Sequence, residues 1–297
     1  MKIQENKKKQ IIQAASETLG KILARQPTLV KGCLPAILSN EGNERHDVLV
    51  NSIEKISREF PELLQERKIF MKLLSFVKVL TGSMRSAVLK SLERYLHVCR
   101  ANKLLDDINE ISLALYADSD DILADISDEN QQAYIQLLTN ISKLNIDSGE
   151  KLIKKVLPRL KVIFVANKND YSRGLFYDLM VFLYDQFELM RPDVKSALIR
   201  GLSDKSKVIR DKLTAFWSDP SRLSLDPTLR IQQLLGDMYV KEEEHIWLNT
   251  AVYLLMQISS QSSDYERKIF DQPLQNCKFT PLEINNYYNA MANLQRS

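Results

Sequence analysis

Glycine and proline are scarce in this sequence of 297 residues. It contains only 8 glycines and 9 prolines, too few for the many tight turns of a β-sandwich or a β-barrel. Apolar residues recur at helical spacing along most of the chain, and no strand-like alternation of apolar and polar residues persists. The sequence therefore predicts an all-α fold.

Cysteine and long apolar runs are also scarce. Cys33, Cys99 and Cys277 are the only cysteines, and an odd number of widely spaced cysteines fits a reducing compartment better than a disulfide framework. No apolar run approaches the ~18 residues that a membrane-spanning helix needs. The lysines at residues 7–9 precede no apolar core, so we expect a solvated helix start there rather than a secretory signal. A nuclear-targeting signal is the alternative.

Motifs that carry catalysis or phosphate binding are missing. The sequence has no GxG or GxxxxGK pattern for a phosphate-cradling loop, and no kinase catalytic loop or metal-binding motif. His46, His97 and His245 are isolated, and His97 and Cys99 are two positions apart, which points them in different directions on a helix. We therefore expect no enzyme, no cofactor and no small-molecule substrate.

The clearest structural unit covers residues 192–217. Two helical stripes of apolar residues lie on either side of an interruption at Ser203-Asp204-Lys205, and we expect Asp204 to be the N-cap of the second helix. The stripes consist of Val194, Ala197, Leu198 and Leu202, followed by Ile209, Leu213, Phe216 and Trp217. Two short antiparallel helices cannot bury both of their faces alone, so this unit needs stacked neighbours of the same kind.

The order of Leu202, Asp204, Val208 and Arg210 resembles a HEAT repeat. We therefore expect a HEAT-like helical-repeat solenoid of stacked antiparallel helix pairs. Asn169, which lies 35 positions before Asp204, is the expected N-cap of the corresponding helix in the preceding repeat. Trp217 and Trp247 are expected to lie in the core, since aromatic residues at helical spacing usually do.

The expected organisation has four parts. Residues 1–117 form N-terminal helical repeats, residues 118–129 an acidic linker, residues 130–260 further HEAT-like repeats, and residues 261–297 an irregular C-terminal tail. The acidic segment lacks the alternation and the closing glutamate of an EF-hand, so we interpret it as a loop between repeats. Pro158 is expected to kink or break the helix in which it lies.

One basic stripe is a candidate nucleic-acid or partner surface. With 41 Lys and Arg against 38 Asp and Glu residues, the formal net charge is only +3, so binding to nucleic acid would require local clustering of basic residues. Such a stripe, placed opposite an apolar face, could contact phosphates, and a plain exposed helix face is the alternative. It consists of Lys151, Lys154, Lys155 and Arg159, at positions i, i+3, i+4 and i+8.

Two strings of the sequence carry a family resemblance, and the second of them has an irregular order that helix periodicity cannot explain. They are FWSDPSRL at residues 216–223 and SSDYERKIFDQPLQNCKF at residues 262–279. Both resemble the family of DNA-dependent protein kinase catalytic subunits, which are PI3K-related kinases, in the middle helical-repeat region upstream of their FAT and kinase domains. The resemblance covers roughly residues 127–283.

The resemblance implies a non-catalytic scaffold segment of a nuclear serine/threonine kinase that acts in double-strand break repair by non-homologous end joining. The partners that it implies are the remaining regions of the parent kinase, the Ku heterodimer and DNA ends. It implies no contact with a membrane. None of the family's ATP-binding or catalytic residues has a counterpart here. Ser260 lies in the only Ser-Gln pair of the sequence. This dipeptide is compatible with phosphorylation at Ser260 and equally with a fraying helix end.

The alternative is a free-standing helical-repeat adaptor that binds peptide or protein partners, and the sequence leaves open whether the chain is a fragment. A solenoid segment without its neighbours exposes uncapped apolar ends, so in that case we expect the isolated chain to be poorly soluble.

Overall fold

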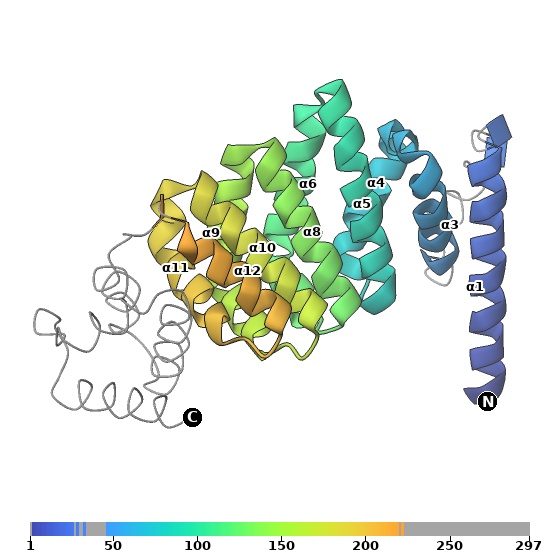
Figure 1. Ribbon diagram of the computed structural model, residues 1–297. Coiled ribbons are helices and arrows are strands. Elements are labelled where there is room, and N and C mark those ends of the chain that lie inside the picture. The colour runs from blue at the N-terminus through green and yellow to red at the C-terminus, as the bar shows by residue number, and fades with distance from the viewer. Residues whose placement is uncertain (1, 27, 30–31, 34–45, 220, 223–297) are drawn as a thin grey trace, which may run out of the picture. The chain divides into compact units, whose positions relative to one another are not determined.

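Helices form all of the regular structure in the described part of the chain. The computed structural model describes residues 2–26, 28–29, 32–33, 46–219 and 221–222, and no strand occurs within these ranges (Figure 1). The predicted all-α fold is therefore confirmed. The tail expected over residues 261–297, the string at residues 262–279, Trp247 and Ser260 lie outside the described residues.

The chain divides into two compact units, Met1–Phe176 and Tyr177–Ser297, and the boundary falls inside α10 (Asp170–Gln186). The acidic segment that we expected as a linker, residues 118–129, lies within the first unit. There it includes a short helix, α7 (Ser119–Ala124), whose Ile122 and Leu123 are buried. This segment thus contributes apolar side chains to the core of the first unit.

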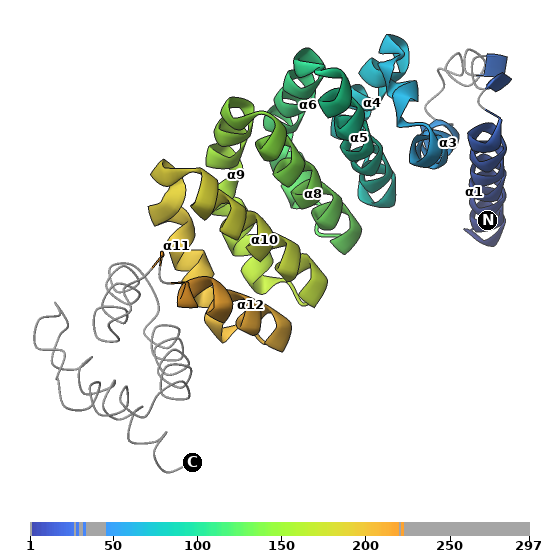
Figure 2. The ribbon, with the colours of Figure 1, turned by 45° about the horizontal axis from the view of Figure 1, so that its top comes forward.

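The helices of the first unit form two layers, which Figure 2 shows side by side. One layer, in which each helix packs on the next, contains α1 (Lys2–Arg25), α3 (His46–Glu59), α5 (Gly82–Asn102) and α8 (Asp128–Leu144). The other layer contains, in the same order of packing, α4 (Arg67–Val79), α6 (Leu105–Ala117) and α9 (Ile146–Ala166). A short 3-10 helix, η2 (Pro61–Gln65), precedes α4.

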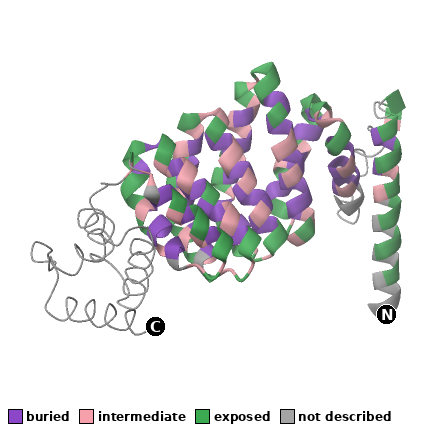
Figure 3. Cartoon of the chain, viewed as in Figure 1, coloured by how far each residue is buried: buried purple, intermediate pink, exposed green. Residues whose placement is uncertain are grey.

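This arrangement buries one side of each helix against its neighbours. Buried residues line the facing sides of the helices, and exposed residues lie on the opposite sides (Figure 3). The helices approach closely where a small residue allows it. A Cβ atom at Gly149 of α9 would lie only 2.5 Å from the Cα of Ser142 in α8, so a side chain at this position would push the two helices apart.

Side-chain hydrogen bonds join helices of successive repeats, and we call this set of bonds the polar ladder. Its partners are 34 residues apart for Ser57 and Ser91, 39 for Ser148 and Asn109, and 47 for Asn140 and Glu93. HEAT repeats have a similar period of about 40–47 residues. The polar ladder therefore repeats with the period of the helix pairs, as the helical-repeat prediction requires.

The second unit contains the helix pair that we predicted from residues 192–217. Its elements after α10 are η3 (Glu188–Met190), α11 (Arg191–Arg200), η4 (Gly201–Ser203) and α12 (Lys207–Ser218). All eight residues of the two predicted stripes are at most 6% exposed. Trp217 makes edge contacts with Tyr184 and Phe216, at centroid distances of 5.5 and 4.8 Å, so its predicted place in the core is confirmed.

The turns within the repeats share one local hydrogen bond. A side-chain oxygen of Asp or Asn accepts the backbone N–H two residues later, in Asp125–Ser127 at 3.2 Å, Asn167–Asn169 at 2.6 Å and Asp204–Ser206 at 2.8 Å. Each turn leads directly into a helix, since α8, α10 and α12 begin at the residue after Ser127, Asn169 and Ser206. An Asx turn thus sets the start of each of the helices α8, α10 and α12.

These turns confirm one predicted cap and correct another. Asn169 accepts the N–H of Ser172 at 3.1 Å, as an N-cap does. Asp204 is not the N-cap of α12, because its carboxylate closes the Asx turn and Ser206 occupies the cap position. Of the kink or break predicted at Pro158, the break is wrong. α9 continues through this residue, whose ring is on the exposed side of the helix.

We expect Trp217→Ala to lower the free energy of unfolding by about 3–5 kcal/mol, because it leaves a cavity beneath Tyr184 and Phe216. Urea denaturation followed by circular dichroism measures this change. Val208→Ala on the same helix is the control, because Val208 is 77% exposed and its truncation should change stability by less than about 0.5 kcal/mol. Equal urea midpoints for the two variants would contradict the core assignment.

Candidate nucleic-acid or partner surface

The four residues of the predicted basic stripe lie on α9, opposite its buried face. Lys151, Lys154 and Arg159 are exposed and Lys155 is half-buried. The helix begins after Asn145, whose side chain accepts the N–H of Ser148 at 3.1 Å and satisfies a free donor of the first turn. The apolar face opposite the stripe is buried, and it consists of Leu152, Val156 and Leu160.

Neighbouring groups already contact most of this stripe. The Lys154 ammonium lies 2.5 Å from the Glu150 carboxylate, and the Arg159 guanidinium donates to Asp120 at 3.0 Å. Lys155 donates to the backbone carbonyl of Tyr116, and its ammonium lies 4.3 Å from the centroid of the Tyr116 ring. Exposed ion pairs of this kind are worth less than about 1 kcal/mol, so an incoming phosphate could replace the carboxylates.

Lys151 differs from the other three basic residues. Within the described ranges its ammonium has neither an ion-pair nor a hydrogen-bond partner. It lies one turn before Lys155 on the exposed side of α9. The sequence thus predicted the shared face, but the positive charge available on it is smaller than four side chains suggest.

The acidic segment holds repeats together. The Asp128 carboxylate accepts hydrogen bonds from Asn167, at 3.0 Å, and from Asn169, at 3.2 Å, in the next repeat. Asp120 pairs with Arg159, as described above. In the part of the chain that the structure covers, no group of three or more His, Cys, Asp or Glu side chains is placed to hold a metal ion.

Asp125 is the most constrained carboxylate of this segment. It accepts the N–H of Gly82 at 2.5 Å and the hydroxyl of Ser127 at 2.9 Å, and it lies 3.8 Å from the Arg85 guanidinium. Burial alone would raise the pKa of Asp125, but these hydrogen bonds and the Arg85 charge hold it below its ordinary value of 3.8. Gly82 has a φ of 59°, a left-handed conformation that glycine adopts without strain.

His97 and Cys99 point in different directions, as expected. His97 is exposed and lies 3.5 Å from the Glu93 carboxylate, whereas Cys99 is fully buried. Burial raises the pKa of the Cys99 thiol to about 12, which favours the protonated form of this sulfur at neutral pH. The hydroxyl of Tyr95 donates to the Asp107 carboxylate, which fixes this ring beside Cys99.

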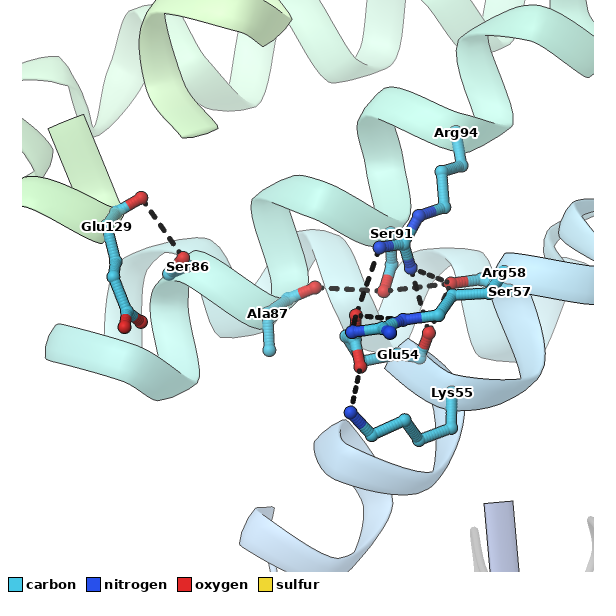
Figure 4. A network of polar contacts seen from close by, with 9 residues as sticks. All are labelled: Glu54, Lys55, Ser57, Arg58, Ser86, Ala87, Ser91, Arg94 and Glu129. Atoms are coloured by element: carbon cyan, nitrogen blue, oxygen red, sulfur yellow. Dashed lines mark hydrogen bonds and ion pairs between the residues drawn. The ribbon is translucent and has the colours of Figure 1, made fainter. Parts of the chain in front are cut away.

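Sequence reasoning missed a second basic cluster, in which three cations surround Glu54 between α3 and α5 (Figure 4). Arg58 and Arg94 both contact the Glu54 carboxylate, together with Lys55. The Glu54–Arg58 spacing of four residues on a helix was a visible signal. Arg94 is 40 residues from Glu54, and only the packing of α5 on α3 brings the two residues together.

Comparison with known proteins places almost the whole chain in one family. The family model described as "DNA-PKcs, CC5" matches residues 1–293. The DNA-dependent protein kinase catalytic subunit of Dictyostelium discoideum is 28% identical over 304 residues, and that of Gallus gallus is 27% identical over 297 residues. Each alignment covers 93% of this chain, which spans only 7% of the length of those relatives. None of the helices in the described ranges is long and apolar enough to cross a membrane.

We expect Asp125→Asn to lower the free energy of unfolding by about 1–3 kcal/mol at pH 7, because it weakens the buried hydrogen bonds from Gly82 and Ser127. The folded pKa of Asp125 is lowered, so its contribution is fully present above its unfolded pKa and is lost as the pH falls through the folded value. The difference between wild type and variant should therefore shrink below about pH 4. Urea denaturation from pH 7 to pH 3 measures it.

Asp120→Asn is the control for this prediction. Asp120 lies in the same segment and its only described ion pair is the exposed one with Arg159, so the substitution should cost less than about 1 kcal/mol. A stability difference for Asp125→Asn that stays constant with pH would contradict the role of its ionised carboxylate.

Proposed function

The chain belongs to the DNA-PKcs CC5 family, and we propose that it serves as a non-catalytic scaffold within a protein like the DNA-dependent protein kinase catalytic subunit. The match of the family model over residues 1–293 is the observation that carries this proposal. The two-layered stack of helices supports it, because each repeat presents exposed side chains on both layers.

We further propose that the scaffold acts in the nucleus, in double-strand break repair by non-homologous end joining. Its partners would be the remaining regions of the parent kinase, the Ku heterodimer and DNA ends. The relatives' shared name, DNA-dependent protein kinase catalytic subunit, supports the kinase context. In this setting the contribution of the chain is positional, since a rigid stack of helices keeps distant parts of a large protein at fixed separations.

The chain is also proposed to carry out no reaction of its own. The described side chains support this view: the thiol of Cys99 is held in its protonated form, and His97 is exposed beside Glu93. The acids and arginines at the repeat junctions are used to connect helices. Catalysis would then belong to other regions of the parent protein.

The basic stripe of α9 is the proposed site of contact with DNA. Lys151 can bind a phosphate without giving up a described partner, and Lys154 and Arg159 can exchange exposed carboxylates for phosphates. Each phosphate contact releases condensed counterions and makes the affinity depend on salt. The stripe follows one exposed side of the helix, which suits successive phosphates along a groove.

The scaffold proposal predicts what the gene encodes around this segment. We expect the transcript to continue, downstream of the codon for Ser297, into a FAT region and a kinase domain. Sequencing the full-length transcript measures this directly. An open reading frame that encodes neither region would contradict the scaffold proposal and favour a free-standing adaptor.

The DNA proposal predicts a change in salt dependence. For binding to a short blunt-ended duplex, we expect Lys154→Ala combined with Lys155→Ala to reduce the slope of log affinity against log salt by about 1 for each phosphate that is no longer bound. Fluorescence anisotropy at several salt concentrations measures the slope. Lys205→Ala with Lys207→Ala is the control, because it removes the same charge from exposed positions outside α9. An unchanged slope in the α9 variant would remove DNA binding at this stripe.

A further inference from the structure

The cluster around Glu54, which we call the Glu54 cluster, combines one carboxylate with three cations (Figure 4). The Glu54 side chain is only 8% exposed, and its Oε1 accepts from Arg58 at 2.9 Å and from Arg94 at 3.0 Å. Its Oε2 lies 3.3 Å from the ammonium of Lys55. The cluster therefore spans two neighbouring helices of one layer, α3 and α5.

The charges in this cluster do not balance. Burial raises the pKa of Glu54, but the hydrogen bonds and charges of Arg58 and Arg94 outweigh it and keep the pKa below its ordinary value of 4.5, so the carboxylate is ionised at neutral pH. One negative charge then faces three positive charges. The nearby acid Glu93 contacts Asn140 and His97 on the other side of α5. The cluster therefore keeps an excess of about two positive charges.

The Arg94 guanidinium is held in place before any ligand arrives. Its Nη1 donates to the backbone carbonyl of Glu54 at 2.8 Å and to the hydroxyl of Ser57 at 3.1 Å. The Ser57 hydroxyl lies 3.3 Å from that of Ser91, which in turn donates to the carbonyl of Ala87 at 2.9 Å. A ligand would thus meet a fixed guanidinium, and its binding would cost little side-chain entropy at Arg94.

Arg58 and Lys55 complete the cluster with donors that remain available. The Arg58 side chain is 51% exposed and contacts Glu54 through Nε and Nη2. Among the described groups, its Nη1 has no hydrogen-bond partner. Among the described groups, the Lys55 ammonium has the Glu54 carboxylate as its one polar partner, which leaves further protons of the ammonium available to donate. Available donors of Arg58 and Lys55 therefore lie beside the fixed positive charge of Arg94.

We propose that the Glu54 cluster is a docking site for a phosphorylated serine or threonine in a partner protein segment. A phosphate group carries about two negative charges and three acceptor oxygens, which complements the charge excess and the arginine donors of this cluster. Guanidinium groups form charge-assisted hydrogen bonds with phosphate; here the Nη1 donors of Arg58 remain available, and Arg94 adds a second, fixed positive charge. This proposal does not depend on the proposed function of the chain.

The surroundings of the cluster favour a protein segment over nucleic acid. Glu59 follows Arg58 at the exposed end of α3. A nucleic-acid strand has a phosphate about every 3.4 Å along the duplex axis, so its neighbouring phosphates would be repelled by this carboxylate. A peptide with a single phosphate among neutral residues avoids this repulsion.

The test uses the full chain and a fluorescent peptide, Gly-Ala-phosphoserine-Ala-Gly, with its unphosphorylated twin. We expect the phosphopeptide to bind, the twin to bind at least about tenfold more weakly, and Arg58→Gln to weaken phosphopeptide binding by about tenfold, as for the loss of a charge-assisted hydrogen bond. Lys55→Gln should weaken binding in the same direction. Fluorescence anisotropy measures the affinities, and circular dichroism melting checks that each variant is folded.

Lys68→Gln is the matched control, since Lys68 is an exposed cation on α4 in the other layer. A single distant charge is screened by salt, so this variant should bind the phosphopeptide within about twofold of wild type. Equal binding of the two peptides, or an affinity that Arg58→Gln leaves unchanged, would overturn the proposal. So would a short duplex DNA that binds more tightly than the phosphopeptide and is weakened by Arg58→Gln.

Discussion

The structure depends on the fact that a pair of short amphipathic helices cannot bury both of its apolar faces alone. In the first unit each helix gains a buried side by packing on its neighbour, as α5 does between α3 and α8. Apolar burial of this kind is non-directional and would tolerate small shifts between helices. The polar ladder supplies the direction, because hydrogen bonds such as Asn140–Glu93 form only in one register.

Polar contacts also determine where positive charge remains on the surface. Carboxylates neutralise nearby cations on α9: Asp120 reaches Arg159 from the preceding acidic segment, and Glu150 pairs with Lys154 within the helix itself. At Glu54 the balance is reversed, because one carboxylate holds three cations and leaves positive charge at the surface. These local charge imbalances are features that a charged partner can recognise.

The turns show how far local rules reach. Asn169 is the predicted cap, but Asp204 lies two residues before the cap of its helix, Ser206, since both Asx turns and N-caps use the same side chains. The repeated Asx-x-Ser or Asx-x-Asn pattern could have been found in the sequence. The continuation of α9 through Pro158 could not have been found in the sequence, because it depends on the proline ring lying on the exposed side of the helix.

The sequence by itself determined the all-α fold, the helix pair at residues 192–217, the buried place of Trp217 and the single face shared by the four basic residues of α9. These properties follow from the spacing of residues within one helix, which the covalent chain fixes. Only the tertiary structure decided which cations are paired with a carboxylate and which are not. Arg94 meets Glu54 from 40 residues away, and Arg159 meets Asp120 from 39 residues away. Such distances along the chain are closed by helix packing, which no local pattern encodes.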